Sequence, residues 1–539
     1  MGTMTYRDSI PFKPYDQNQA TFLPPSLDEL IPAGHQVRFV NKVVDQMNLD
    51  SVYATYAGGG TSSYHPRMMV KVLLYGYVQR IYSARKLAKA LRENVHFMWL
   101  AAGQTPDFRT INDFRKSRLQ PTLKELFTQL MGQLVELGLV DLGEYFIDGT
   151  KVEANARRHS AVWAKKVERH RVSVRRQIEE LFDQIQQIAE AEDLDLGEAD
   201  LPETGGQSDW DSADVEATVE RINSALAQPE SGDSREGNSN GSCKPGSPAS
   251  RRRLRQLLRR LGRDKLPRLQ RYEAQKRTLD GRNSYSKTDP EATFMRGKHQ
   301  PFSPMQMRAC YNLQLGTQNQ FILGYSLHQN AGDKVVLAAH LDRLGFRPDA
   351  LIGDGGYGSL ANYEELNKRD IAAYLKYPGY DRRPSPYEAR QMSYNLGEDA
   401  YICPQGQRIS YRGDRIRKDG TRVRVYQSPD CNGCPVRAEC VPEGQEHRKF
   451  IVNTKLNLWR NTMDRRLAGG LGEALKKRRS AEVESVFGQL KGNDGLGRLV
   501  MRGLAMGELE VGLKAMAHNL RRWHKLLTEG ADRMAPALG

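Results

Sequence analysis

Two short apolar runs in this chain each end in an aspartate followed by glycine, and this repeated feature constrains the fold most. The run Tyr145–Ile147 reaches Asp148, and the run Ala350–Gly353 reaches Asp354. Apolar runs of this length, bounded by glycine, are typical of buried strands. We therefore expect two strands that each deliver one carboxylate to the strand end. Taken singly, an aspartate before glycine at a strand end is most often an ordinary turn aspartate.

A third acidic candidate, Glu484, lies far downstream in a segment with helical character. Glu482 is its rival, but the two positions lie about 200° apart on a helix, so both cannot face one site. Lys491 stands seven residues after Glu484, about two helical turns on and on nearly the same face. This spacing puts a cation beside the carboxylate, where it suits the phosphate of a DNA end.

Carboxylates held on rigid elements are what metal-dependent phosphodiester chemistry requires. Mg²⁺ prefers carboxylate oxygens and keeps water positions open for substrate, and Mn²⁺ accepts the same donors. Glycine beside each aspartate lets backbone approach the substrate closely. The sequence therefore predicts that Asp148, Asp354 and Glu484 are catalytic residues that bind Mg²⁺ or Mn²⁺.

The charge balance points to a polyanionic partner. The chain of 539 residues has 80 Lys and Arg against 65 Asp and Glu, a net charge of +15. A surplus of this size favours nucleic acid, although a basic surface that is merely solvated is the alternative. No stretch approaches the roughly 20 apolar residues of a membrane span. The six cysteines are more typical of reduced thiols or metal ligands than of a disulfide framework, so we expect a cytoplasmic protein.

Helical patterns dominate the first part of the chain, and a length of 539 residues suggests two to four domains. We assign residues 1–139 to a helical DNA-binding domain of helix-turn-helix type, with Arg109 and Arg115 on its basic last helix. A packing domain with solvated cations is the alternative. Residues 159–283 form a helical, basic insertion with a disordered linker near 229–250. The basic helix after this linker carries three further candidates for phosphate contact: Arg252, Arg255 and Arg259.

Strands and helices alternate around the two aspartates, which predicts a mixed α/β sheet. A hairpin is expected from Cys310–Leu315 and Phe321–Leu327, followed by a helix, the Asp354 strand, another helix and a strand at Ile371–Leu375. The catalytic core would comprise residues 140–158, 284–378 and 470–528, and residues 379–469 would be a cysteine-rich insertion.

Four cysteines fall in that second insertion. Cys431-x-x-Cys434 is followed by Cys440, and Cys403 stands upstream. Four thiolates suit one tetrahedral structural Zn²⁺, and an insertion poor in sheet would need such help to fold. Free thiols and a redox pair are the alternatives.

The chain resembles the DDE transposases of bacterial insertion sequences over most of its length. The resemblance rests on several motifs together: His65-Pro66-Arg67, Pro106-Asp107-Phe108-Arg109, Ile147-Asp148-Gly149-Thr150-Lys151, Tyr311-Asn312-Leu313-Gln314, Gly353-Asp354-Gly355-Gly356-Tyr357, Val483-Glu484 with Phe487-Gly488 and Lys491, and Arg498 with Arg502-Gly503. It implies an RNase H-like core and supports Glu484 over Glu482 as the third metal-binding acid.

Related transposases often place a tyrosine and an arginine before this glutamate and a lysine after it. Lys491 fits the last position, but Ser480 stands four residues before Glu484 and Arg479 one residue further back. The role of the arginine is therefore open, and no tyrosine stands nearby. We count Arg479, Lys491, Arg498 and Arg502 among the DNA-binding candidates.

The resemblance implies a bacterial, nucleoid-associated enzyme that binds terminal inverted repeats, cleaves DNA and joins the freed 3′ end to target DNA, as a homodimer on paired ends. Two rivals remain: a metal-dependent nuclease on the same fold, and a catalytically inactive transposase remnant that acts as a repressor.

Overall fold

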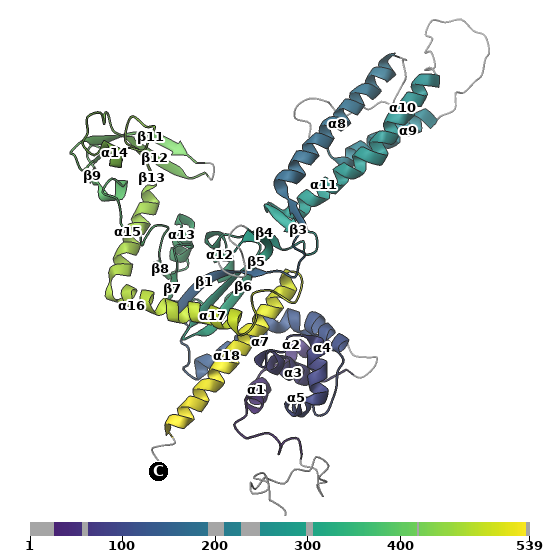
Figure 1. Cartoon of the computed structure of the whole chain (residues 1–539), viewed down its shortest axis with the longest axis vertical. Coiled ribbons are helices and arrows are strands. Elements are labelled where there is room, and N and C mark those ends of the chain that lie inside the picture. Colours follow the sequence, from purple (N-terminus) through teal and green to yellow (C-terminus); the bar gives the residue numbers. More distant parts are fainter. Residues whose placement is uncertain are drawn as a thin grey trace, which may run out of the picture. The chain divides into compact units, whose positions relative to one another are not determined.

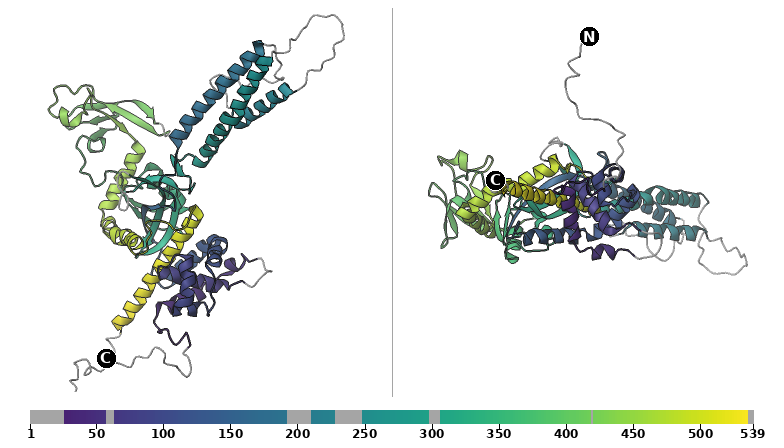
Figure 2. Two further views of the ribbon diagram at one scale, coloured as in Figure 1. Left: turned by 45° about the vertical axis from the view of Figure 1, so that its right-hand side comes forward. Right: turned by 90° about the horizontal axis from the view of Figure 1, so that it is seen from below.

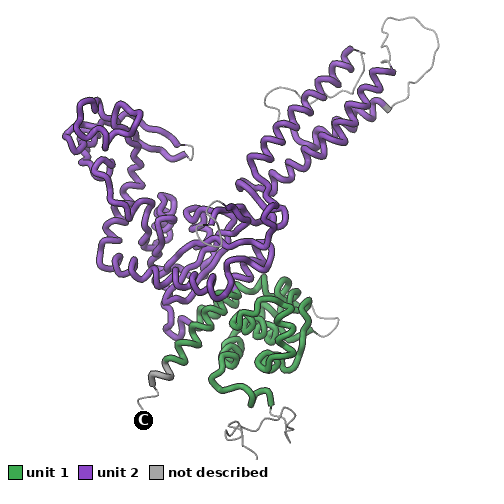
Figure 3. Tube along the Cα trace, viewed as in Figure 1, with its two compact units in different colours: residues 1–133, 513–539 green, residues 134–512 purple. Residues whose placement is uncertain are grey.

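The computed structural model describes residues 26–56, 63–191, 210–227, 248–297, 306–417 and 420–534. The chain divides into two compact units, coloured separately in Figure 3. Unit 1 comprises residues 1–133 and 513–539, and unit 2 comprises residues 134–512. Of the linker predicted near 229–250, residues 229–247 lie outside the described residues. Residues 248–250 belong to the start of a helix instead.

Unit 1 is helical. Its elements in chain order are α1 (Gln36–Asp45), α2 (Asp50–Tyr53), α3 (Pro66–Val78), α4 (Ala84–Glu93), α5 (Val95–Leu100), α6 (Phe108–Asp113), the π-helical turn η2 (Phe114–Leu119), most of α7 (Gln120–Glu136) and the larger part of α18 (Leu504–Met534). Pro66 suits the first position of α3, where no backbone N–H is needed. Asp107 caps α6 by accepting a hydrogen bond from the amide of Thr110. Because residues 513–539 belong to unit 1, the last helix is shared between the helical unit and unit 2 rather than confined to the core.

A six-stranded mixed sheet forms the centre of unit 2 (Figure 1). Its strands are β4 (Thr293–Arg296), β5 (Met307–Gln318), β1 (Glu144–Glu153), β7 (Ala350–Gly353) and β8 (Ala372–Leu375) in spatial order, and β6 (Phe321–His328) also pairs with β5. Strands β4, β6 and β1 each pair antiparallel with β5, whereas the pairs β1–β7 and β7–β8 are parallel. Helices α12 (Leu337–Leu341) and α13 (Leu360–Lys368) connect the later strands. The predicted mixed α/β class is confirmed, and the sheet is consistent with an RNase H-like core.

The hairpin of β5 and β6 closes over a buried tyrosine. Asn319 and Gln320 both have positive φ, as a tight two-residue hairpin turn requires. A Cβ atom at Gly316 would stand 1.7 Å from the ring of Tyr145, and one at Gly324 would stand 2.6 Å from its hydroxyl oxygen. The two glycines therefore make room for the Tyr145 ring between β1 and the hairpin.

The first strand runs further than its sequence indicates. We expected Asp148 at a strand end, but β1 continues to Glu153, so this expectation was wrong. The reason is tertiary pairing, since β5 continues to pair with β1 through Glu153 after the parallel partner β7 has ended. Asp354, in contrast, directly follows β7 as predicted.

Between β1 and β4 the chain leaves the sheet and forms a helical arm. The two-stranded pair β2 (Ala161–Trp163) and β3 (Ser284–Ser286) joins the ends of this arm. Its helices are α8 (Ala164–Ala191), α9 (Ser212–Ala227), α10 (Pro248–Arg260), the π-helical turn η3 (Leu261–Lys265) and α11 (Leu266–Leu279). They share one apolar core, and Figures 1 and 2 show that α10 and α11, which follow each other through η3 in one continuous helix, run beside α8.

The cysteine-bearing insertion is built on a sheet, so the expectation of a sheet-poor segment was wrong. Five antiparallel strands lie in the order β13 (Lys449–Val452), β12 (Arg422–Gln427), β11 (Arg408–Ile416), β10 (Ala400–Ile402) and β9 (Ser393–Asn395). β12 alternates arginine with valine before Tyr426, and Met392, Ile409, Tyr426 and Val452 form the small core of this sheet. Helix α14 (Arg437–Cys440) lies between β12 and β13 in the sequence. After β13 the chain continues through α15 (Thr454–Ala468), α16 (Gly470–Arg479), the π-helical turn η6 (Ser480–Glu484) and α17 (Ser485–Gly492). Among the described residues, no helix is both long and apolar enough to cross a membrane.

Candidate active site

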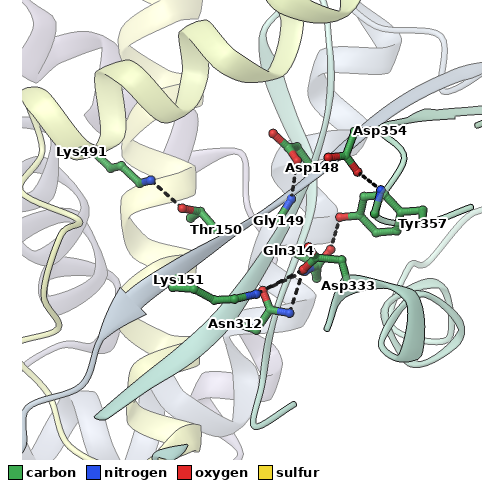
Figure 4. Close-up of polar contacts among 11 residues, drawn as sticks. Asp148, Gly149, Thr150, Lys151, Asn312, Gln314, Asp333, Asp354, Tyr357 and Lys491 are labelled. Atoms are coloured by element: carbon green, nitrogen blue, oxygen red, sulfur yellow. Dashed lines mark hydrogen bonds and ion pairs between the residues drawn. The ribbon is translucent and has the colours of Figure 1, made fainter. Parts of the chain in front are cut away.

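Asp148 and Asp354 come together because their strands are parallel neighbours. Phe146 of β1 is paired with Ile352 of β7, and each aspartate stands two residues further along the chain. Parallel pairing keeps equivalent positions level with each other, so both acids lie beside the end of β7. Figure 4 shows their carboxyl groups near one another.

Burial raises the pKa of the Asp148 carboxyl to about 6. The Arg479 guanidinium opposes this shift, while the nearby carboxylates of Asp354 and Asp333 add to it. The backbone N–H of Gly149 donates a hydrogen bond of 2.9 Å to Asp148. Several carboxylates thus share a half-buried space, and their hard oxygen donors are those that Mg²⁺ and Mn²⁺ prefer.

Arg479 connects the first acid to the third. Its guanidinium lies 3.4 Å from Asp148 Oδ2 through Nη2 and 3.4 Å from Glu484 Oε1 through Nη1. Arg479 is five residues before Glu484, and in an α-helix such residues would point about 140° apart. The intervening turn, η6, is π-helical, with the i→i+5 pattern that brings residues five apart onto one face. The π turn therefore absorbs the extra residue that separated Arg479 from its expected position in the sequence.

Glu482 and Glu484 have different surroundings. Glu482 is buried, accepts a hydrogen bond of 2.7 Å from the backbone N–H of Gln320 and lies 3.6 Å from Arg478. The Glu484 side chain is 57% exposed and pairs with Arg479. Glu482 therefore fastens η6 to the turn between β5 and β6, which leaves Glu484 as the acid available to a ligand.

Lys491 approaches the same strand from α17. Its ammonium donates a hydrogen bond of 2.5 Å to the hydroxyl of Thr150, two residues after Asp148 (Figure 4). Burial lowers the pKa of Lys491, and the negative charge of Asp148 opposes that shift. The expected cation beside the acids thus comes from the predicted residue, although its direct partner is the hydroxyl.

Sequence reasoning missed a polar network beneath the acids. Asp333 begins the 3₁₀ turn η4 (Asp333–Val335) after β6 and accepts hydrogen bonds from Asn312 and Gln314 of β5. Two amides that alternate with the apolar residues Tyr311, Leu313 and Leu315 in β5 are a signal that could have been read. Asp333 itself gives no such signal in the sequence, since a Gly-Asp pair after a strand usually forms an ordinary turn.

The predicted DNA-contacting arginines differ in exposure. Arg109 is exposed at the start of α6. Arg115 is buried, with its guanidinium 5.7 Å from the centre of the Tyr77 ring, so its prediction as a phosphate contact was wrong. The π-helical turn η2 directs Arg115 inward together with Phe114 and Leu119.

The remaining arginines are exposed. On α10, Leu254, Leu257 and Leu258 face the core of the arm, so the opposite side of the helix carries its cations to solvent. Exposed candidates on this side are Arg252, Arg255 and Arg259. Arg498 and Arg502 are also exposed and donate to the backbone carbonyls of the segment after β1.

The four cysteines of the second insertion surround one small cavity of about 30 Å³. Cys403 accepts a hydrogen bond from the backbone N–H of Gln407, and the Cys431 sulfur lies 2.9 Å from the hydroxyl of Ser428. Burial raises the pKa of the Cys440 thiol, and the other three cysteines add to the shift. Four sulfur donors around one cavity suit a tetrahedral Zn²⁺. Nevertheless, across the described residues no group of three or more His, Cys, Asp or Glu side chains is arranged to hold a metal ion.

Comparisons with known proteins find two family matches in this chain. Residues 25–117 match the family described as Transposase domain (DUF772), and residues 402–524 match the family described as Transposase DDE domain. The first match covers helices of unit 1, and the second contains Glu484, Arg479 and Lys491. No curated protein and no solved structure matches the chain. Both matches are to transposase families, and together they support a DDE transposase of the insertion-sequence type.

Proposed function

We propose that this transposase binds the terminal inverted repeats of an insertion sequence, cleaves DNA with divalent metal and joins the freed 3′ end to target DNA. One observation carries the proposal. The parallel pairing of β1 and β7 sets Asp148 level with Asp354, and Arg479 links Asp148 to Glu484 from the helix that matches the transposase DDE domain.

Asp148, Asp354 and Glu484 would hold Mg²⁺ or Mn²⁺, which activates the attacking oxygen and stabilises the leaving oxygen in phosphodiester chemistry. The chain's own contribution is to position charge. Arg479 already stands between two of the acids and neutralises part of their repulsion. Lys491, held by Thr150, presents an ammonium beside Asp148 where a DNA phosphate would need one.

DNA would be held by exposed cations that lie far apart in the sequence. Candidates for phosphate contact are Arg109 in unit 1, the α10 arginines of the arm, and Arg498 and Arg502 beside the segment that follows β1. A homodimer on paired DNA ends, acting at the bacterial nucleoid, completes the proposal. We further propose that Cys403, Cys431, Cys434 and Cys440 bind one structural Zn²⁺, because they line one cavity.

A strand-transfer assay with labelled terminal DNA and Mg²⁺ tests this function. We expect the wild-type protein to cleave and to join, and Asp354→Asn to lose both steps while it still binds DNA, because the variant removes one anionic oxygen donor and little volume. Asp370→Asn is the matched control, since that side chain is 92% exposed and pairs only at the surface with Arg347.

Each rival function predicts a different result in the same assay. Cleavage without joining by the wild-type protein would favour a nuclease, and binding without either step would favour a repressor. Full cleavage by Asp354→Asn would exclude the proposed metal site.

A further inference from the structure

Asp333 is an acid beside the proposed metal site that the catalytic triad does not include. It lies at the first position of η4, between β6 and α12, and its side chain is 20% exposed. The negative charge of Asp333 is one of the causes that raise the pKa of Asp148. A carboxylate so close to the proposed site, and so little exposed, needs a physical role.

One oxygen of this carboxylate is held by three donors. Asp333 Oδ1 accepts hydrogen bonds of 2.9 Å from Asn312 Nδ2 and 3.0 Å from Gln314 Nε2, and it lies 3.4 Å from Lys151 Nζ (Figure 4). The donors come from β5 and β1, so Asp333 ties its own loop to both strands. A carboxylate that is only partly exposed and has this number of partners is well fixed in position.

Asp333 also determines the orientation of the Gln314 amide. Since Gln314 Nε2 donates to Asp333 and to Asn312 Oδ1, Gln314 Oε1 is left to accept a hydrogen bond from the hydroxyl of Tyr357. Tyr357 is fully buried and stands three residues after Asp354, and its backbone N–H donates to the Asp354 carbonyl. A chain of hydrogen bonds therefore runs from Asp333 to the turn that carries Asp354.

The glycines around the two catalytic candidates leave space for this arrangement. A Cβ atom at Gly149 would stand 2.5 Å from Asp333 Oδ1 and 2.5 Å from Gln314 Nε2. At Gly356 a Cβ atom would stand 2.9 Å from Asp354 Oδ1 and 3.5 Å from Asp333 Oδ2. The glycine next to Asp148 and the glycine two residues after Asp354 thus both border Asp333, which places its carboxylate between the two acids' neighbouring backbones.

We propose that Asp333 is a positioning residue of the active site, which fixes the turn of Asp354 through Gln314 and Tyr357 and holds Lys151 beside the acids. The inference rests on the proposed function, because it assigns a role in the same site. It predicts that Asp333 acts through its capacity to accept hydrogen bonds rather than as a ligand of the metal.

The test compares three variants of the full chain in single-turnover cleavage of labelled terminal DNA across a Mg²⁺ titration. Asp333→Ala removes the acceptor, and we expect a rate loss of about 10- to 100-fold, the usual effect of losing a partner that orients a metal ligand. Asp333→Asn keeps an acceptor oxygen, so it should retain most of the rate. Asp342→Ala is the matched control, because Asp342 is 62% exposed and pairs with Arg369.

Two readouts distinguish positioning from a general loss of structure. The Mg²⁺-induced rise in melting temperature, measured without DNA, should weaken in Asp333→Ala and persist in Asp333→Asn. Tyr357→Phe removes the hydrogen bond between Tyr357 and Gln314, the last in the series that starts at Asp333. The loss of rate in the double variant should be smaller than the sum of the losses in Asp333→Ala and Tyr357→Phe, since residues in one network couple.

Equal and complete loss of cleavage in Asp333→Asn and Asp333→Ala would overturn the inference, because the charge rather than the acceptor would then be required. So would additive effects of Asp333→Ala and Tyr357→Phe, or a wild-type rate in Asp333→Ala. These outcomes are read only where the wild-type protein cleaves; a wild-type protein that does not cleave refutes the proposed function itself.

Discussion

At the scale of single residues, Glu482 and Glu484 have different roles: the first holds the structure together and the second is available for chemistry. Glu482 is buried against the backbone of Gln320, whereas Glu484 is exposed and pairs with Arg479. Their side chains are chemically identical and stand two positions apart, so a matched pair of substitutions can assign their roles.

We expect Glu484→Gln to abolish cleavage and to leave the melting temperature close to that of the wild-type protein. Glu482→Gln should instead cost about 1–3 kcal/mol of stability, because it weakens the hydrogen bond that the buried carboxylate accepts from the backbone N–H of Gln320 and its pairing with Arg478. Cleavage assays and thermal unfolding of both variants check this prediction. A stable, fully active Glu484→Gln protein would contradict it.

A second residue-scale prediction concerns acid sensitivity. His340 is fully buried between Tyr145 and Ser326, and burial lowers its pKa from 6.5 to about 3. Since the folded-state pKa lies below the unfolded value, the unfolded chain takes up the proton first as the pH falls. The stability present above pH 6.5 is therefore lost progressively between pH 6.5 and about 3.

The expected size of this effect is about 2 kcal/mol on going from pH 7 to pH 5, from the free energy of one pKa unit. His340→Gln lacks the titrating ring, so its melting temperature should fall less steeply over this range. Thermal unfolding at several pH values measures both slopes. His328, whose pKa burial also lowers, remains in both proteins, and parallel slopes would show that His340 is not responsible.

At the scale of elements, the second insertion combines a small sheet with a cluster of cysteines. Its apolar core contains few buried residues, among them Met392, Ile409 and Tyr426. Small cores of this kind rarely supply enough stability alone, and a bound metal is one means by which such modules fold.

Metal analysis of the purified protein should therefore find about one zinc per chain, the number that four thiolate ligands bind. Cys431→Ser should lose this zinc and make the insertion more sensitive to proteolysis. Cys310→Ala is the control, because Cys310 is buried in β5 and belongs to the core sheet. Wild-type protein without zinc would remove the assignment.

The sheet of unit 2 also shows how far its elements follow from local patterns. From β5 onward, the order of strands and helices, the hairpin turn and the strand that ends before Asp354 were expected from short apolar runs and turn residues, whereas the edge strand β4 was not. The length of β1 was not, because β5 continues the ladder past a glycine that locally favours a turn. Pairing across the sheet overrode the local signal.

At the scale of the whole molecule, the positive charge is spread over separate parts of the chain. Exposed arginines occur on α6 of unit 1, on α10 of the arm and after α17. Each phosphate contact releases counterions, so every part that touches DNA should contribute to the salt dependence of binding.

We expect the double substitution Arg252→Ser with Arg259→Ser to reduce the slope of log affinity against log salt by about 2, since each lost phosphate contact removes about 0.9. The matched control is Arg169→Ser with Arg176→Ser, which removes the same charge from exposed positions of α8. Measurements of the affinity for terminal DNA at several salt concentrations give the slope for each double variant and for the wild-type protein. An equal change in both double variants would mean that net charge, rather than α10, binds the DNA.

The sequence by itself determined the elements that carry chemistry: two Asp-Gly segments on apolar strands, a helix with Glu484 and Lys491, four cysteines in one insertion and a surplus of arginine. Such signals are local, because a strand or a helix depends mainly on its own pattern of apolar residues. The family motifs added the association among the three acids.

Only the tertiary structure decided which groups meet. Arg479 reaches both Asp148 and Glu484 because a π turn brings residues five apart onto one face. Asp333 reaches the site from a loop with no distinctive pattern, and Arg115 turns inward against Tyr77. Some of these contacts join residues that are distant in the chain, and the others depend on a one-residue change of helical phase at a π turn. The local spacing of apolar residues in the sequence predicts neither kind of contact.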